Sequence, residues 1–104
     1  MKIYVAGPYT NGDVAQNVRT AIEYGNNLRA LGHTPFIPHL THFWHLVFPH
    51  KYQYWMDYDI EWLLQCDALF RVAGKSDGAD LEEEIAKKYD MPIYTSYLEI
   101  PKNK

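Results

Sequence analysis

The sequence has little cysteine, no long apolar run and no strong excess of one charge. Its one cysteine, Cys66, excludes a disulfide within the 104 residues, and we expect a buried thiol because free cysteines usually are buried. No stretch approaches the roughly 18 apolar residues that a membrane span needs. The chain opens directly on the apolar run Ile3–Ala6, without a signal-peptide pattern. These absences predict a cytoplasmic protein that does not enter membranes.

Clustered basic residues are also missing. Ten Lys and Arg stand against 13 Asp and Glu, and basic residues gather only in the tail Lys102–Lys104. A nucleic-acid polymer is therefore not expected as a partner, because phosphate binding needs clustered cations. Aromatic residues, in contrast, make up 15% of the chain, many of them between Phe43 and Trp62. We expect some of these rings to line a pocket or a contact between subunits.

Apolar periodicity predicts one α/β domain over residues 1–104. The order of elements is typical of a flavodoxin- or Rossmann-like, doubly wound parallel sheet of about four or five strands in three α/β/α layers. Pro35 and Pro38 place the second strand at an edge, and Asp13 is the expected N-cap of the first helix. The expected strands are 3–6, 34–38, 67–72 and 91–94, the helices are 14–31, 52–65 and 78–89, and residues 39–51 form a long loop with room for a short helix.

Such sheets bind ligands beyond the carboxyl ends of their strands. These ends carry residues 7–10, 39–42 and 74–78. Three glutamates lie in the helix expected after residues 74–78. Two of them, Glu83 and Glu84, each have a lysine four positions on, which predicts ion pairs on the helix surface. Glu82 has no such lysine, so it is the carboxylate without a surface explanation. A plain exposed glutamate remains the alternative.

Two further groups of residues have both a structural and a functional interpretation. Ser76 precedes a helix and is either an ordinary N-cap or part of an anion site with Gly78. Asp59 shares a helical stripe with Trp55, Trp62 and Cys66, which would hold an acid against a flat ring such as a nucleobase. A partly exposed helix residue is the alternative for Asp59, and Asp67 could simply end that helix.

The histidines His39, His42, His45 and His50 raise the question of a metal site. Their spacing places them on one face only if the segment is helical, and no cysteine or carboxylate lies beside them. Zinc sites usually show tighter patterns. We expect loop packing or ligand contact, and no metal.

Three blocks of sequence, in this order, resemble the nucleoside 2-deoxyribosyltransferase superfamily, including its nucleoside 5′-monophosphate N-glycosidase branch. The opening residues 2–10 are similar to the family's first strand and substrate loop. Asp59, eight residues before Asp67, is similar to its catalytic aspartate. The segment from Ser76 to Ala86, followed by residues 91–93, is similar to its nucleophile helix and last strand.

The resemblance implies an enzyme that breaks an N-glycosidic bond with two carboxylates. Glu82 would attack the anomeric carbon and hold the sugar covalently, as in retaining glycosidases. Asp59 would protonate or hydrogen-bond the leaving base, and Tyr4 would orient the nucleophile. The resemblance also implies a nucleoside or nucleotide partner, no metal or organic cofactor, and a homodimer or larger homo-oligomer.

One departure from the family pattern bears on the substrate. Deoxyribosyltransferases usually carry an aspartate two residues before the glycine, where this chain has Ser76, as the monophosphate branch does. A serine beside a helix N-terminus favours a phosphate, so we expect hydrolysis of a nucleoside 5′-monophosphate to free base, although Asp77 opposes this. A base-exchanging transferase and a non-catalytic nucleotide-binding module remain the alternatives. The expected substrate-binding residues are Gly7, Tyr9, Thr10, Trp55, Ser76 and Gly78.

Overall fold

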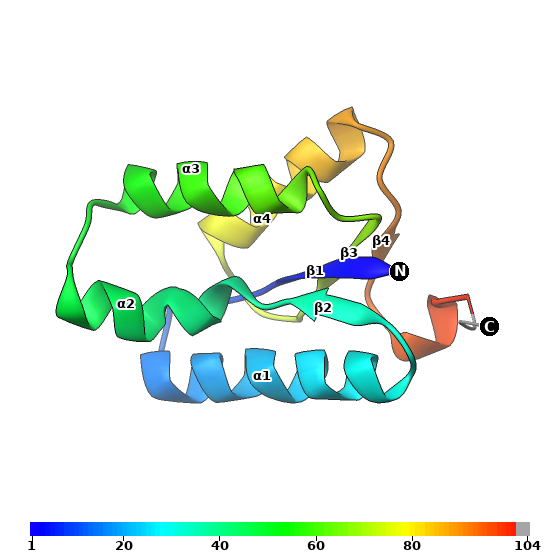
Figure 1. The fold of residues 1–104 in the computed structure, drawn as a ribbon, viewed down its shortest axis with the longest axis horizontal. Coiled ribbons are helices and arrows are strands. Elements are labelled where there is room, and N and C mark those ends of the chain that lie inside the picture. Colours follow the sequence, from blue (N-terminus) through cyan, green and yellow to red (C-terminus); the bar gives the residue numbers. More distant parts are fainter. Residues whose placement is uncertain (102–104) are drawn as a thin grey trace.

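The computed structural model describes residues 1–101, so the basic tail Lys102–Lys104 lies outside the described residues. Four parallel strands form one sheet in the order β2-β1-β3-β4 (Figure 1). This arrangement confirms the predicted parallel sheet and the edge position of the second strand. The strands are β1 (Lys2–Ala6), β2 (Thr34–Phe36), β3 (Ala68–Arg71) and β4 (Ile93–Tyr94).

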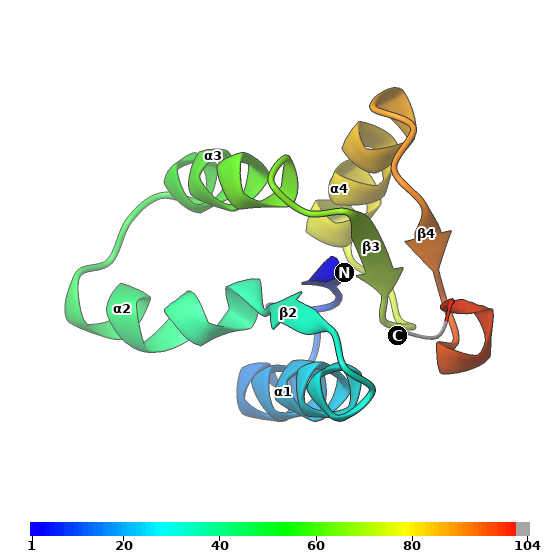
Figure 2. The same cartoon turned by 45° about the vertical axis from the view of Figure 1, so that its right-hand side comes forward.

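Helices cover both faces of the sheet, as predicted. Helix α1 (Val14–Ala30) lies on one face, and α3 (Tyr52–Leu63) and α4 (Asp77–Lys88) lie on the other (Figures 1 and 2). Both α3 and α4 begin near the carboxyl edge of the sheet and run back across it. None of the helices in residues 1–101 has the length and apolar character to cross a bilayer.

Local signals explain where the first helix begins and ends. The Asp13 side chain accepts a hydrogen bond from the Gln16 amide, which satisfies one free N–H of the first turn. Gly32 has a φ of +94°, the left-handed conformation that commonly follows a helix end. The predicted N-cap and C-terminal stop are confirmed.

Two segments are more ordered than expected. The second strand stops at Phe36, and residues 39–51, predicted as a long loop, hold most of the 3₁₀ helix η1 (Pro38–Thr41) and all of α2 (His42–Val47). After β4, the expected tail forms η2 (Tyr97–Glu99) and buries Ile100. Ser96 and Glu99 form a capping box there, a signal that is present in the sequence.

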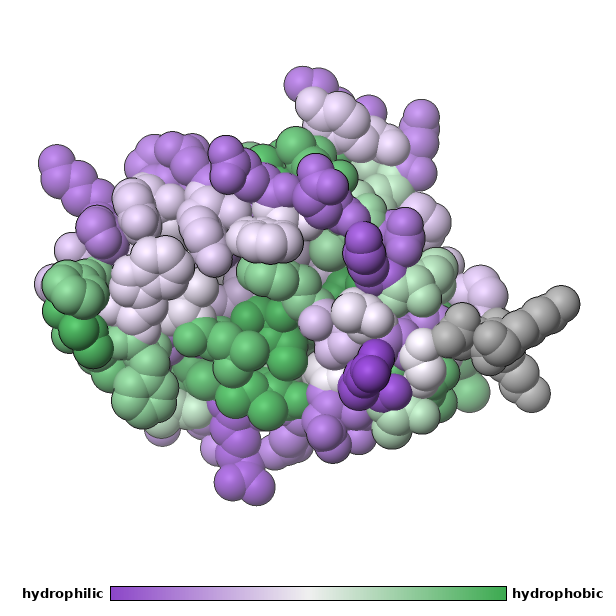
Figure 3. Space-filling view, in the orientation of Figure 1, coloured by the Kyte–Doolittle hydropathy of each residue, from purple (hydrophilic) through white to green (hydrophobic). Residues whose placement is uncertain are grey.

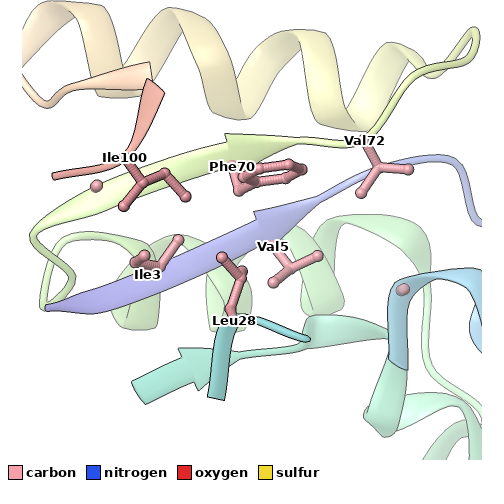
Figure 4. Close-up of a cluster of buried hydrophobic side chains, with 8 residues drawn as sticks. Ile3, Val5, Leu28, Phe70, Val72 and Ile100 are labelled. Carbon is pink, nitrogen blue, oxygen red and sulfur yellow. The ribbon is translucent and has the colours of Figure 1, made fainter. Parts of the chain in front are cut away.

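The main apolar core lies between the sheet and α1. Successive residues of a strand point to opposite faces, so Ile3 and Val5 enter this core while Tyr4 and Ala6 face α3 and α4. Figure 4 shows Ile3 and Val5 packed with other apolar side chains from α1, β3 and the C-terminal segment. The buried members are Ile3, Val5, Ala21, Leu28, Ala68, Phe70, Val72 and Ile100.

Candidate active site

Glu82 lies on the face of α4 that packs inward. Ser76 caps this helix, because its side chain accepts a hydrogen bond from the Ala79 amide at 3.1 Å. The helix therefore starts in a register that turns Glu82 away from solvent, and 6% of the residue is exposed. The alternative of a plain surface glutamate is wrong for Glu82.

A tyrosine hydroxyl satisfies this buried carboxyl group. Tyr4 is fully buried on the central strand β1, and its hydroxyl donates a hydrogen bond to Glu82 Oε2. The Tyr4 ring stacks on Phe36, with 5.6 Å between ring centroids. Burial, together with the nearby Glu82 charge, raises the pKa of Tyr4 well above its ordinary value. The hydroxyl therefore keeps its proton, and its role as a donor, at neutral pH.

Asp59 is the second carboxyl group of the site and comes from α3. Its Oδ1 atom is buried, and no donor within residues 1–101 bonds to it. Burial raises the pKa of Asp59 to about 7. The Asp59 charge acts on both Tyr4 and Glu82 and raises the pKa of each. The structure therefore brings the three residues predicted to be catalytic into one electrostatic unit.

Opposing effects set the protonation of Glu82. Burial raises the pKa of Glu82 to about 8, and the Asp59 charge adds to the rise. The Tyr4 hydrogen bond and the Arg71 charge act in the opposite direction, because both stabilise the ionised form. The two carboxyl groups are thus held where loss of the second proton is unfavourable near neutral pH.

Arg71 was not singled out by the sequence analysis. It ends β3, its side chain is 11% exposed, and it donates hydrogen bonds to the Val72 and Gly74 carbonyls at 3.2 and 2.7 Å. It also pairs with Asp80 at 3.2 Å and with Glu83 at 3.5 Å. The sequence signal that could have identified Arg71 was the presence of a charged residue at the end of an otherwise apolar strand.

The predicted surface pairs on α4 are wrong in detail. Glu83 pairs with Arg71 instead of a lysine four residues on, and Glu84 pairs with Lys87, three residues on, at 3.7 Å. Arg71 reaches α4 from the neighbouring strand and competes for Glu83. Helix spacing alone could not reveal this tertiary partner.

The turn that opens α4 is covered by α3. A Cβ atom added to Gly78 would lie 3.2 Å from the Tyr52 hydroxyl and 3.8 Å from Met56 Sδ. The small size of Gly78 therefore admits these two side chains of the same chain. Tyr52 is a second residue that the sequence analysis missed, and its signal was its position on the stripe of Asp59, seven residues earlier.

The loop after β1 is held by two histidines. The His39 ring donates from Nε2 to the Pro8 carbonyl at 2.9 Å, and the Tyr9 hydroxyl lies 2.5 Å from His42 Nδ1. Gly7 is buried, and a Cβ atom on it would lie 2.9 Å from Val72 Cβ, so this glycine permits β1 and β3 to approach closely. Of the predicted substrate residues in this loop, Tyr9 is partly buried and Thr10 is exposed.

Trp55 is placed among aromatic side chains of α2 and α3. Its indole N–H bonds to His45 Nδ1 at 2.8 Å, and its ring packs edge-on against Trp44 and Tyr58. Trp62, by contrast, stacks on Phe36 with 5.4 Å between centroids and so joins the stack that contains Tyr4. Within residues 1–101, no three His, Cys, Asp or Glu side chains are grouped so that they could hold a metal ion.

Cys66 is less buried than predicted. It follows the end of α3, is partly exposed, and packs at the margin of the core formed by Tyr4, Leu63 and Leu69. It also lines a shallow hollow of about 350 Å³ with Asp67. This hollow lies at the amino ends of the strands, away from Glu82.

The chain matches the model of a family described as a domain of unknown function, DUF4406, over residues 1–95. The chain belongs to the DUF4406 family. Among solved structures, it is similar to a 2-deoxyribosyltransferase from the psychrotolerant bacterium Bacillus psychrosaccharolyticus, with a TM-score of 0.67 and 23% identity. The match covers 89% of this chain and 69% of that one, and it shows a shared fold. A search of the curated proteins gave no match.

In this DUF4406 protein, the buried Tyr4 and Glu82 and the half-buried Asp59 lie on the α3–α4 side of the sheet. Asn11 Nδ2 bonds to the Lys75 carbonyl at 2.9 Å, so the loops after β1 and before α4 adjoin. A carboxyl group that is buried, bonded by a phenol and paired with a second carboxyl group is suited to nucleophilic or acid–base work. Tyr4 pairs with Phe36, the last residue of β2, so these side chains lie toward the carboxyl edge of the sheet, where sheets of this topology bind ligands.

Proposed function

We propose that this chain cleaves the N-glycosidic bond of a nucleoside, holds the sugar on Glu82 and transfers it to a second base. The observation that carries the proposal is the geometry of three groups. Glu82 is buried and accepts a hydrogen bond from Tyr4, while the charge of Asp59, whose buried Oδ1 has no donor within residues 1–101, acts on both. The charged form of Glu82 thus has a hydrogen-bond donor, whereas the buried oxygen of Asp59 has none within residues 1–101.

In the first step, a Glu82 carboxylate oxygen attacks the anomeric carbon of the sugar. The bond from that carbon to the base nitrogen breaks, and its electron pair goes to the base. Asp59 donates its proton to the base as negative charge develops there. Tyr4 holds Glu82 in place through its hydrogen bond. The product is a glycosyl ester on Glu82 and a neutral free base.

In the second step, a nitrogen of an incoming base attacks the anomeric carbon, and the ester bond to Glu82 breaks. The proton of that nitrogen passes to Asp59, which restores the starting state. Two displacements at one carbon retain its configuration, as in retaining glycosidases. Water in place of the second base would give hydrolysis by the same route.

This mechanism needs charge on Glu82 and a proton on Asp59, whereas burial leaves the pKa of Glu82 at about 8 and that of Asp59 at about 7 in the free protein, so a proton passes from Glu82 to Asp59 before the attack. The Tyr4 hydrogen bond and the Arg71 charge favour the ionised form of Glu82. The Asp59 oxygen without a donor favours the neutral form of Asp59, because a buried carboxylate needs partners. Mutual repulsion opposes the doubly ionised state.

Transfer to a base is preferred over transfer to water because the similar solved structure is a 2-deoxyribosyltransferase. Hydrolysis of a nucleoside 5′-monophosphate is the second candidate, and the observation that favours it is Ser76 at the N-terminus of α4. Its Oγ accepts from Ala79 N, which leaves the hydroxyl proton for an anion. The Asp77 carboxylate in the first turn opposes a phosphate there.

The test incubates the wild-type protein with 2′-deoxynucleosides and their 5′-monophosphates, each with and without a second free base. Chromatography then scores released base and new nucleoside. New nucleoside supports the transferase, and free base from monophosphates alone supports the hydrolase. Glu82→Gln should lose at least about 1,000-fold in rate, because the nucleophile is gone.

The matched control is Glu84→Gln, which removes an exposed carboxylate from the same helix. It should keep the wild-type rate. If folded wild-type protein releases no base from any compound yet binds a nucleotide, the non-catalytic binding module replaces the enzyme. Equal rates for wild type and Glu82→Gln would remove Glu82 from the mechanism.

We further propose that the protein self-associates through α2. Figure 3 shows hydrophobic surface gathered over α2 and its flanks, and Phe43 is 78% exposed. Exposed apolar patches of this kind usually mark an interface. Sedimentation at micromolar concentration should show a dimer or larger species, and a monomer would contradict this. The exposed apolar residues are Leu40, Phe43, Leu46, Val47 and Phe48.

A further inference from the structure

The Tyr52 hydroxyl is a hydrogen-bond donor beside the first turn of α4, the helix that carries Glu82. Tyr52 is the first residue of α3, and it is 62% exposed. Its hydroxyl lies over the first turn of α4, since a Cβ atom on Gly78 would be 3.2 Å from it. Within residues 1–101 this hydroxyl has no hydrogen-bond partner. The Tyr52 hydroxyl is therefore available to donate a hydrogen bond to a ligand.

Three carboxyl groups lie close enough to this donor to act on its pKa. Burial raises the pKa of Tyr52, and the charges of Glu82, Asp77 and Asp59 raise it further. The phenol therefore keeps its proton at neutral pH and can donate to a ligand oxygen. A neutral donor among carboxylates also gives a ligand oxygen one favourable partner where the surroundings would otherwise repel it.

The position of Tyr52 along α3 determines which part of a nucleoside it can reach. Tyr52 and Asp59 are seven residues apart on one face of α3, which separates their backbones by about 10 Å along the helix axis. Met56 lies between them and is buried. This span is comparable with the length of an extended nucleoside from the base to the 5′-oxygen. If the base lies at Asp59 and the anomeric carbon at Glu82, Tyr52 and Gly78 are left for the 5′ end of the sugar, because each lies in the first turn of its helix.

We propose that the Tyr52 hydroxyl donates a hydrogen bond to the 5′-oxygen substituent of the sugar and so selects substrates that carry one. The inference rests on the proposed function, because it takes the base to lie at Asp59. It gives Tyr52 a substrate-binding role that separates 5′-oxygenated nucleosides from 5′-deoxy analogues.

The test is a cycle between protein and substrate. Wild type and Tyr52→Phe are each assayed for kcat/KM on a 2′-deoxynucleoside, or its 5′-monophosphate if that reacts faster, and on the matching 2′,5′-dideoxynucleoside. Tyr52→Phe should lose about 5- to 10-fold on the 5′-oxygenated substrate, the size of one hydrogen bond. It should match wild type on the 5′-deoxy analogue.

Tyr54→Phe is the matched control. Tyr54 lies on the same helix turn, its ring stacks on His50 with 3.8 Å between centroids, and its hydroxyl bonds to nothing within residues 1–101. It should behave as wild type on both substrates. Both variants should unfold at the wild-type denaturant midpoint, because neither hydroxyl bonds to any residue of the described range 1–101.

Three results would overturn the inference about Tyr52. In the first two, wild type is active, and Tyr52→Phe either has the wild-type kcat/KM on both substrates or loses the same factor of kcat/KM on both. Either result removes the inference about Tyr52 and leaves the proposed function in place. If wild type binds a deoxynucleoside 5′-monophosphate in calorimetry but releases no base, the proposed function falls. Weaker binding by Tyr52→Phe then keeps the inference, and equal binding removes it. Absence of both binding and turnover by wild type overturns both.

Discussion

Alternate residues of the same two central strands build two very different faces. Toward α1, Ile3, Val5 and Phe70 join a core that is entirely apolar. Toward α3 and α4, Tyr4 and Leu69 lie beside a buried carboxyl group, Glu82. The first face stabilises the fold by burying apolar area, whereas the second includes a group whose charged form is costly to bury. The alternation of side chains along the strands thus places the residues that stabilise the fold on one face of the sheet and those of the proposed chemistry on the other.

The largest expected effect on stability comes from removing an aromatic ring on the face of the sheet that packs against α1. Phe70 is 1% exposed and packs against Tyr24 and Tyr97. Phe70→Ala should lower the free energy of unfolding by about 3–5 kcal/mol, through lost apolar burial and the cavity left behind. Urea unfolding measures this change. The folded fraction should keep the wild-type kcat/KM.

Leu69→Ala is the counterpart on the other face. Leu69 is fully buried and pairs in register with Tyr4. It should lower stability by about 2–5 kcal/mol and also lower kcat/KM, because the strand that neighbours Tyr4 shifts. If Phe70→Ala reduced kcat/KM as much as Leu69→Ala at matched folded fraction, the separation of the two faces would be wrong.

A smaller effect tests the cost of burying Glu82. Its pKa rises from an ordinary 4.5 to about 8 in the folded protein. The folded state therefore binds more protons than the unfolded state between these values, and this contribution to stability falls as the pH rises from about 4.5 through about 8. Glu82→Gln does not titrate and keeps an acceptor for Tyr4. It should be more stable than wild type at pH 8 by about 2–4 kcal/mol.

The measurement is urea unfolding of both proteins from pH 4.5 to 8. The advantage of Glu82→Gln should shrink toward zero at the acidic end, where the Glu82 carboxyl is neutral in both states. The exposed Glu84→Gln variant serves as control and should follow wild type throughout. A Glu82→Gln variant less stable than wild type at pH 8 would show that the carboxylate stabilises the fold.

Short-range patterns in the sequence were sufficient for the sheet and its helices, but less so for the site. The parallel sheet, the Asp13 cap and the edge position of β2 follow from periodicity and turn residues alone, and the structure confirms them. The sequence left room for a short helix within residues 39–51, where α2 forms, whereas η2 was not predicted although its capping box is present in the sequence.

The partners of the acidic residues could not be read from spacing, since they come from other elements. Glu83 finds Arg71 across from β3, and Gly78 makes room for Tyr52 of α3. Glu82 was found because it lacked a lysine on its own helix, whereas the role of Tyr4 beside it came from the family resemblance and not from local spacing. Local spacing therefore identified the buried carboxyl group, but tertiary packing determined what surrounds it.

The smallest expected effect concerns the charge that Arg71 sets beside Glu82. Because this charge lowers the pKa of Glu82, its removal should raise that pKa further. If ionised Glu82 is the nucleophile, kcat/KM falls on the acid side with the pKa of Glu82. Arg71→Gln should therefore move the acid limb of the pH profile upward by about 0.5–1 unit.

Two controls separate the charge of Arg71 from its structural bonds. Arg71→Lys keeps a positive charge but loses the paired hydrogen bonds to Val72 and Gly74, so its acid limb should stay near the wild-type position even if its rate falls. Arg19→Gln removes an exposed charge that pairs with Glu23 on α1, and it should leave the profile unchanged. Arg71→Lys and Arg71→Gln could instead move the acid limb of the pH profile by the same amount. Arg71 would then act by holding the loop in place through its hydrogen bonds. Burial and the Tyr4 hydrogen bond alone would set the pKa of Glu82.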